Sequence, residues 1–263
     1  QSSEEDFGYP GKGFGGKGCI LRTEQEGFAM KVSAANPNFG GMAPHLMCRK
    51  EDVADVVLLP GDPGRVSLMA PLFDKFDVIA RNREYTVGTG EYKGRRISVC
   101  STGIGAPSTE IAVVELVEMG AKALIRVGGT GVLRREIACG DLVINTAAMR
   151  RGGSSCFYAP SEFPAVAAHE VVTCLLEAGK ARGKACWTGI SASVGSFFAG
   201  QGRPAAGIDF NTRDVCADYK KLNILNMEME AETIWMLPLQ SSTSVPVGSA
   251  ASENNDPLEK NEL

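Results

Sequence analysis

Residues 97–127 read ISVCSTGIGAPSTEIAVVELVEMGAKALIRV, and the order of residue types in them predicts how the chain folds. An apolar run (97–100) is followed by a glycine-containing turn (101–107) and then by a run with helical spacing. Pro107 suits the first turn of a helix and Gly120 suits its end. A second apolar run occupies 123–127. The stretch therefore predicts a strand–helix–strand unit. The apolar positions expected on one side of its helix are Ile111, Val114 and Val117.

The same alternation continues on both sides of this unit. Runs rich in Val, Ile and Leu at 56–59 (VVLL) and 141–144 (DLVI) predict two more strands. A second helix is expected from Pro164 to near Gly183, and a third over NMEMEAETIWML (226–237), which Pro238 ends. Strands that alternate with helices are typical of an α/β fold.

Composition limits the possible functions. The chain has 263 residues, of which 44% are hydrophobic and 22% are charged, so it can form a packed core, and one large domain is expected. Its net charge of −4 argues against general binding to nucleic acid or to an acidic membrane. The longest uncharged stretch (185–202) is rich in Gly and Ser and is not suited to cross a membrane. A small-molecule partner is therefore favoured over nucleic acid or membrane.

The cysteines and histidines argue against a structural metal. The eight cysteines form no C-x-x-C pair, and His45 and His169 are the only histidines. Several cysteines have apolar neighbours, which indicates reduced thiols and a cytoplasmic location.

The two ends of the chain differ from its middle in composition and in hydrophobic periodicity. Residues 1–41 are rich in glycine and are expected to be a flexible extension, with GKGFGGKG favoured as a linker over a phosphate loop because no strand precedes it. Residues 238–263 have neither strand nor helix periodicity and are expected to be a disordered tail. The predicted functional domain is therefore 42–237.

Three glycine-containing turns follow predicted strands: PGDPGR (60–65), STGIGAP (101–107) and GGTG (128–131). In an open α/β sheet, loops beyond neighbouring strands converge on one crevice, where glycine lets backbone N–H groups approach an anion. Arg65 and Arg126 accompany two of the turns, and a guanidinium suits phosphate. The alternative is that Arg65 begins a helix and Arg126 makes a structural salt bridge. Spacing alone does not separate the two readings.

Seven motifs make a more specific case. They are PGDPGRV, NREYTVGTGEYKG, VCSTGIGAPSTEIAVVEL, IRVGGTG, YAPSEFPAVA, SFFAGQGR and NMEMEAET. Their order and spacing resemble the nucleoside phosphorylase family, and most closely its members that act on uridine. The resemblance covers the chain from about His45 to about Trp235. It implies a three-layer α/β/α fold around a mixed, partly barrel-like central sheet. It also implies a homodimer, or a hexamer built as a trimer of dimers, in which subunits share active-site residues.

The resemblance also implies a set of site residues. Phosphate would be bound by Gly61, Arg65, Arg126 and Thr130, with Arg83 coming from the partner subunit. The ribose would lie against Met229, with Glu230 accepting from its hydroxyls and His45 reaching in from the partner. The base would contact Phe197, Gln201, Arg203 and Glu228. The catalytic set would be Arg126, Gln201, Arg203 and Glu230. A potassium ion at the dimer interface would lie near Glu84, Ile104 and Ser108.

The expected reaction is the reversible phosphorolysis of uridine to uracil and ribose 1-phosphate. Gln201 offers a donor and an acceptor and Arg203 offers donors, which complements the polar edge of uracil. The alternative interpretation is that Gln201 and Arg203 both lie on a surface loop. Inorganic phosphate is the co-substrate, and the chemistry requires neither a metal nor another cofactor. A purine or broad-specificity phosphorylase and a ligand-binding or storage homologue without activity are the other functions considered.

The chain departs from the family pattern at two places. Gly129 stands where the family usually carries a Thr or Ser hydroxyl, so Thr130 or the backbone would have to replace one hydrogen bond. After the NMEMEAETIW motif the chain continues into the polar tail, so the C-terminal strand and helix of the family are expected to be missing. These departures are the basis for considering a homologue without activity.

Overall fold

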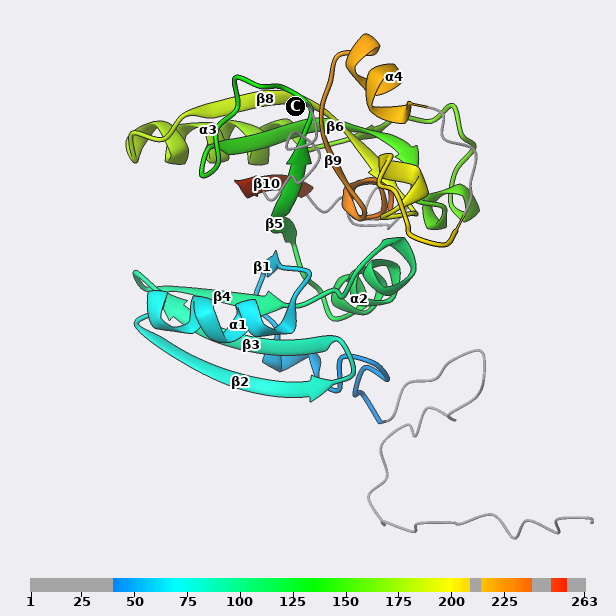
Figure 1. Cartoon of the computed structure of the whole chain (residues 1–263). Helices are drawn as coiled ribbons and strands as arrows, with labels where there is room; N and C mark the ends of the chain where they lie inside the picture. Colours follow the sequence, from blue (N-terminus) through cyan, green and yellow to red (C-terminus); the bar gives the residue numbers. More distant parts are fainter. Residues whose placement is uncertain (1–39, 209–213, 238–246, 255–263) are drawn as a thin grey trace, which may run out of the picture. The chain divides into compact units, whose positions relative to one another are not determined.

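The computed structural model describes residues 40–208, 214–237 and 247–254 (Figure 1). Nearly all of the predicted N-terminal extension, and residues 238–246 and 255–263 of the predicted tail, lie outside the described residues.

The described residues form one sheet with helices beside it. Its strands are β1 (Val56–Leu59), β2 (Lys75–Asn82), β3 (Tyr85–Tyr92), β4 (Arg95–Cys100), β5 (Ala123–Val132), β6 (Leu142–Arg151), β7 (Ala165–Val166), β8 (Cys186–Val194), β9 (Ile224–Glu228) and β10 (Val247–Asn254). The α-helices are α1 (Pro63–Met69), α2 (Ala106–Glu118), α3 (His169–Ala181), α4 (Val215–Lys221) and α5 (Ala231–Met236). Short 3₁₀ turns are η1 (Lys50–Asp52), η2 (Ala70–Leu72), η3 (Ser154–Phe157) and η4 (Ala199–Gln201).

The strand–helix–strand unit predicted from residues 97–127 is confirmed. β1 lies between β4 and β5 and is parallel to both, with Leu58 opposite Val99 on one side and Ile125 on the other. α2 connects β4 to β5, as the crossover of a parallel pair requires. β2 and β3 add to the β4 edge as antiparallel strands.

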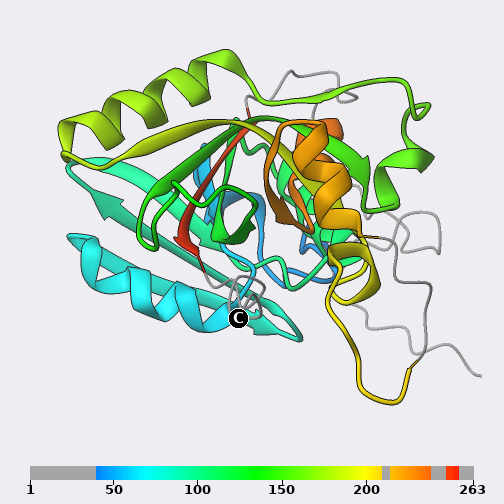
Figure 2. The same cartoon turned by 45° about the horizontal axis from the view of Figure 1, so that its top comes forward.

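The other half of the sheet closes on itself. β5 pairs with β9, β9 with β8, β8 with β6, β6 with β10, and β10 again with β5. Both parallel and antiparallel pairs occur in this ring. In Figure 1, β5 runs from the β1–β4 group to this ring, and α3 lies along β6 and β8 there and in Figure 2. The expected mixed, partly barrel-like sheet is confirmed.

The expectation that the C-terminal strand is missing is wrong. Residues 247–254 form β10, which inserts between β5 and β6, with Ser249 opposite Arg126 and Asn145. The tail has weak strand periodicity because its residues are small and polar. Backbone pairing on both sides therefore decides the structure here, rather than side-chain pattern.

Two helix predictions need correction. The helix expected from Pro164 begins at His169, because Ala165 and Val166 pair with β6 as β7. The first part of the helix expected over 226–237 is strand β9, and only Ala231–Met236 is helical. Met and Glu alternate from 227 to 230, a period of two that favours a strand.

The buried side of α2 also differs from the expected one. Ala112, Val113 and Leu116 are fully buried, whereas Ile111, Val114 and Val117 pack only partly against the core. The same core cluster contains Leu124 of β5, Tyr85 of β3 and Trp235 of α5. It therefore fixes β5 and α5 relative to α2.

Candidate active site

A cavity of about 860 Å³ lies where several strands end. The turns after β1 and β4 reach it with Gly61 and Gly103, which are joined by a 2.9 Å bond from the N–H of Gly103 to the carbonyl of Gly61. Since β1, β4 and β5 are parallel, their carboxyl ends meet at one edge of the sheet. Ten of the predicted binding residues line the cavity: Gly61, Arg65, Arg126, Thr130, Phe197, Gln201, Arg203, Glu228, Met229 and Glu230.

Arg126 is the central charged group of this cavity. Its Nε donates to Glu228 Oε2 at 3.4 Å, and its Nη2 donates to Glu230 Oε2. All three side chains are buried. Its Nη1 is buried and has no hydrogen-bond partner among the described residues. Arg126 is therefore an ion-paired residue, as one interpretation of the sequence held, and one of its donors has no partner among the described residues.

The two glutamates are held by backbone N–H groups. Glu228 Oε2 accepts from the N–H groups of Glu230 at 2.9 Å and of Ala231 at 2.7 Å. Glu230 Oε1 accepts from the N–H of Gly105 at 2.7 Å, which ties it to the start of α2. The surface-face alternative for Glu230 is excluded, because the residue is only 4% exposed.

Burial raises the pKa of Glu228 above its ordinary value. The guanidinium of Arg126 lowers that pKa and the carboxylate of Glu230 raises it again, with burial the largest effect. Glu228 therefore holds a proton to higher pH than an exposed glutamate.

Gly128 explains how Arg126 fits into the sheet. A Cβ at this position would lie 2.9 Å from Nη1 of Arg126, closer than real side chains approach. The prediction that GGTG forms a turn after the strand is wrong, because residues 128–131 continue β5. Here glycine makes room for the guanidinium within the strand.

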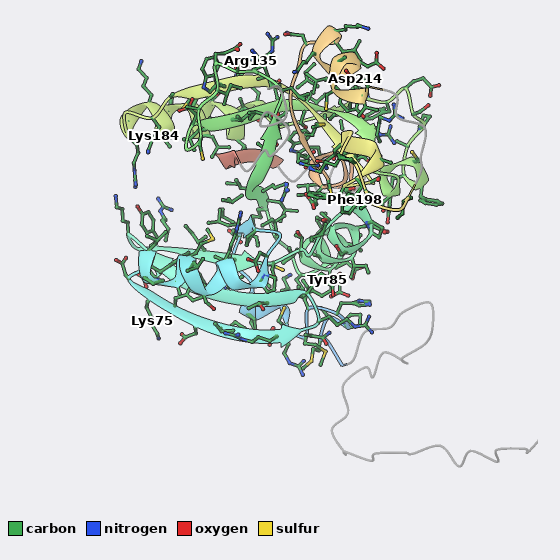
Figure 3. The ribbon with its side chains drawn as sticks, viewed as in Figure 1. Lys75, Tyr85, Arg135, Lys184, Phe198 and Asp214 are labelled. Atoms are coloured by element: carbon green, nitrogen blue, oxygen red, sulfur yellow. The ribbon has the colours of Figure 1, made fainter. Side chains whose placement is uncertain are left out.

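The segment after β8 also lines the cavity, through Phe197, Gln201 and Arg203. Gln201 is 3% exposed and Arg203 is buried, so the surface-loop alternative for this pair is excluded. Arg203 Nη1 donates to Gln201 Oε1 and, at 3.0 Å, to the carbonyl of Phe197. The guanidinium of Arg203 lies 4.0 Å from the centre of the Phe197 ring. Phe198, labelled in Figure 3, packs edge-on against Phe197.

Thr130 lines the cavity, but its hydroxyl is already engaged. The hydroxyl donates to the carbonyl of Met227 at 2.7 Å and accepts from Nδ2 of Asn226 at 2.7 Å. The hydroxyl proton is therefore not free for phosphate, and any contact from Thr130 to phosphate would come from its backbone. Thr130 thus does not replace the hydroxyl that is missing at Gly129.

His45 and Arg83 are not among the residues that line the cavity of a single chain. Nδ1 of His45 lies 2.6 Å from Oε1 of Glu115, which also accepts from the backbone N–H of Leu46 through Oε2 at 2.8 Å. Arg83 is exposed in the tight turn between β2 and β3, with φ of 53°. A role for either residue in a partner's site stays a prediction.

Glu84, Ile104 and Ser108 come together at the edge of the cavity. The hydroxyl of Ser108 donates to the carbonyl of Ile104 at 3.1 Å. A Cβ at Gly103 would lie 2.7 Å from Cγ of Glu84 and 3.0 Å from Oγ of Ser108. The three residues are thus neighbours, and a role in binding potassium stays a prediction.

Seven lining residues were not named individually as binding residues in the sequence analysis. They are Asp62, Pro63, Gly103, Gly128, Gly129, Gly131 and Met227. All seven lie within the motifs quoted from the sequence, and six of them lie within the three glycine-containing segments that were expected to meet at one crevice. Within the residues that the structure describes, no helix has the length and apolar character needed to cross a membrane.

Taken together, an α/β sheet with a buried arginine between two carboxylates, at the strand ends, defines a site for a small polar ligand that carries an anionic group. Residues 55–237 match the family model described as the Phosphorylase superfamily. The chain belongs to this superfamily.

Proteins of similar sequence include a uridine phosphorylase and a guanosine phosphorylase. A uridine phosphorylase of Thermococcus kodakarensis is 47% identical over 209 residues, which cover 78% of this chain and 76% of that protein. A guanosine phosphorylase of Halorubrum lacusprofundi is 34% identical over 194 residues, covering 74% and 76%. The crystal structure of a uridine phosphorylase from Vibrio fischeri superposes with a TM-score of 0.74 at 31% identity, covering 81% of this chain and 84% of that one.

Proposed function

We propose that the chain catalyses the reversible phosphorolysis of uridine to uracil and ribose 1-phosphate. The observation that carries the proposal is that the buried, ion-paired Arg126 lines the same cavity as Gln201 and Arg203. Arg126 thus offers a cation to phosphate. Gln201 and Arg203 offer the donors and acceptor that complement the polar edge of uracil.

Catalysis in this arrangement is positioning and electrostatics. Phosphate, held by Arg65, Arg126 and the backbone at Gly61, attacks C1′ of the ribose as the bond to N1 of the base breaks. Positive charge that develops on the sugar is stabilised by the phosphate and by the carboxylate of Glu230. Negative charge that develops on the base is stabilised by Arg203 and Gln201. No covalent intermediate with the enzyme is formed.

The charge of the cavity supports a shared site in an oligomer. Within one chain, Glu228 and Glu230 offset much of the charge of Arg126. A phosphate dianion therefore needs further cations, and Arg83 of a second subunit would supply one. The protein is accordingly proposed to be a homodimer or a hexamer, with His45 completing the neighbour's ribose site and potassium near Glu84. The seven cysteines of the described part are free thiols, which supports a cytoplasmic location.

Restoring a hydroxyl at Gly129 is expected to strengthen phosphate binding. Thr130 does not supply the missing donor, and one added hydrogen bond contributes about 0.5–1.5 kcal/mol. Gly129→Thr should therefore lower the KM for phosphate by about two- to tenfold, with little change in the KM for uridine. Initial rates at varied phosphate check this. A KM for phosphate that stays the same or rises would mean that phosphate does not lie against residue 129.

The base preference is tested with a panel of nucleosides. Purified protein is incubated with phosphate and uridine, 2′-deoxyuridine, thymidine, inosine or guanosine, and base release is measured by chromatography. The proposal expects uridine to have the highest kcat/KM. A higher value for inosine or guanosine would instead assign the chain to the purine phosphorylases.

A further inference from the structure

Glu232 is a buried carboxylate that the proposed reaction does not use. It follows Glu228 and Glu230 in the same motif, yet it is not among the residues that line the cavity. It is fully buried. Its partners among the described residues are uncharged: the N–H groups of Gly152 at 3.0 Å and Gly153 at 3.1 Å, and the hydroxyl of Ser155 at 2.9 Å. Burying a charge in this way is costly unless the bonds serve the fold or the site.

The bonds connect Glu232 to an arginine that holds the segment after β6. Ser155 donates to Glu232 and accepts from Nε of Arg150 at 3.0 Å. The guanidinium of Arg150 also donates to the carbonyls of Ser155 at 2.8 Å, Ala159 at 2.9 Å and Phe163 at 2.8 Å. One hydroxyl thus links a buried carboxylate to a guanidinium that binds residues 155–163.

This segment lies against the start of α2. A Cβ at Gly152 would lie 2.8 Å from Oε1 of Glu232 and 3.3 Å from Cβ of Ala106, the first residue of α2. The residue before it, Gly105, donates its N–H to Glu230 at 2.7 Å. The hydroxyl of Tyr158 also donates to Glu110 of α2. Glu232 therefore fixes the backbone next to the group that orients Glu230.

The backbone of Glu232 also makes a hydrogen bond to β8. Its N–H donates to Oγ of Ser193 at 3.3 Å, and Ser191, two residues earlier on that strand, donates to Glu228 Oε1 at 3.4 Å. The residue thus lies where the ends of β6 and β8, the start of α2 and the start of α5 meet.

We infer that Glu232 is a positioning residue for the active site. By holding the end of β6 and the 152–163 segment against the start of α2, it keeps the N–H of Gly105 directed at Glu230, and through Glu230 it keeps Arg126 in place. This inference rests on the proposed function for its kinetic readout. Phosphate affinity gives it a second readout that does not depend on turnover.

A double-mutant cycle tests the inference. Glu232→Gln keeps the shape but places an amide where backbone N–H groups donate, and it is expected to lower kcat/KM for uridine about tenfold. In a Glu230→Gln background, Glu232→Gln is expected to lower kcat/KM for uridine by less than about twofold, because the effect of Glu232 on the site passes through Glu230. Ser155→Ala, a milder change to the same network, should cost about threefold, and it takes the place of Glu232→Gln in the cycle if that variant does not fold.

The matched control is Asp141→Asn. Asp141 accepts from the N–H of Ala138 at 3.0 Å and from Nε1 of Trp187 at 2.9 Å, and it does not line the cavity. Thermal melts should show a loss of stability in the control as well, with kcat/KM within about twofold of wild type. Equal losses for Glu232→Gln in both backgrounds, or no loss in either, would overturn the inference.

The test separates this inference from the proposed function. If the wild-type chain releases no uracil, the proposed function fails, and the cycle is then read from the affinity for inorganic phosphate by calorimetry. Weaker phosphate binding in Glu232→Gln, absent in the Glu230→Gln background, would still support the inference. Unchanged phosphate affinity in the wild-type background would refute it.

Discussion

Arg126→Ala is expected to lower phosphate-dependent uracil release by about a hundred- to a thousandfold, the usual effect of losing one directed charged donor in an active site. The structure adds a cost in stability. Without the guanidinium, Glu228 and Glu230 face each other in a buried site, and removing one partner of a buried ion pair costs about 3–5 kcal/mol. Because Glu228 already has a raised pKa, it is expected to take up a proton in this variant. Steady-state kinetics and urea unfolding measure the two effects.

The control for this variant is Arg95→Ala, which removes an exposed arginine at the start of β4. It should leave both the rate and the unfolding free energy close to wild type. Arg126→Lys keeps the charge but not the forked geometry, and it should recover stability better than rate. Wild-type phosphorolysis in Arg126→Ala would show that phosphate binds elsewhere.

Gln201→Ala is expected to reduce kcat/KM for uridine about a hundredfold while changing that for inosine less than about threefold. The physical reason is that a site built to hydrogen-bond one polar edge discriminates strongly when its partner is lost. The variant also frees Nη1 of Arg203 from Oε1 of Gln201, so the remaining guanidinium is less well oriented toward uracil. Competition assays with both nucleosides in one reaction measure the ratio directly.

Ser196→Ala serves as the neighbouring control, since Ser196 is exposed and does not line the cavity. Its kcat/KM values for both nucleosides should match those of wild type. Equal losses for uridine and inosine in Gln201→Ala would remove the basis for assigning uracil to Gln201 and Arg203.

The parts of the fold that follow from local pattern could be predicted from the sequence. The β4–α2–β5 unit has apolar runs, a proline at one helix end and a glycine at the other, and these signals all agree. β9 and β10 could not be placed in this way. The alternation of Met and Glu at 227–230 favours a strand, but the run of α5 follows it so closely that the whole stretch was interpreted as one helix. β10 has small polar residues whose pairing with β5 and β6 is a long-range effect.

The site was predicted mainly through the family motifs, which brought Arg126, Glu230 and Gln201 together before any geometry was known. The hydrogen bonds that each side chain already makes within the fold could not be predicted in the same way. The hydroxyl of Thr130 has the right chemistry for phosphate, yet Met227 and Asn226 already occupy it. Glu232 has the residue type of its two neighbours in the motif, but its direction depends on where the end of β6 passes.

Uracil release from uridine by the purified chain, with and without inorganic phosphate, tests the central claim most directly. Release is expected only with phosphate, together with an equal amount of ribose 1-phosphate and a cooperative thermal melt. Release of uracil and free ribose without phosphate would contradict it, because water would then be the nucleophile. A cooperative melt with no release under either condition would also contradict it, and would leave a folded homologue that binds without catalysis.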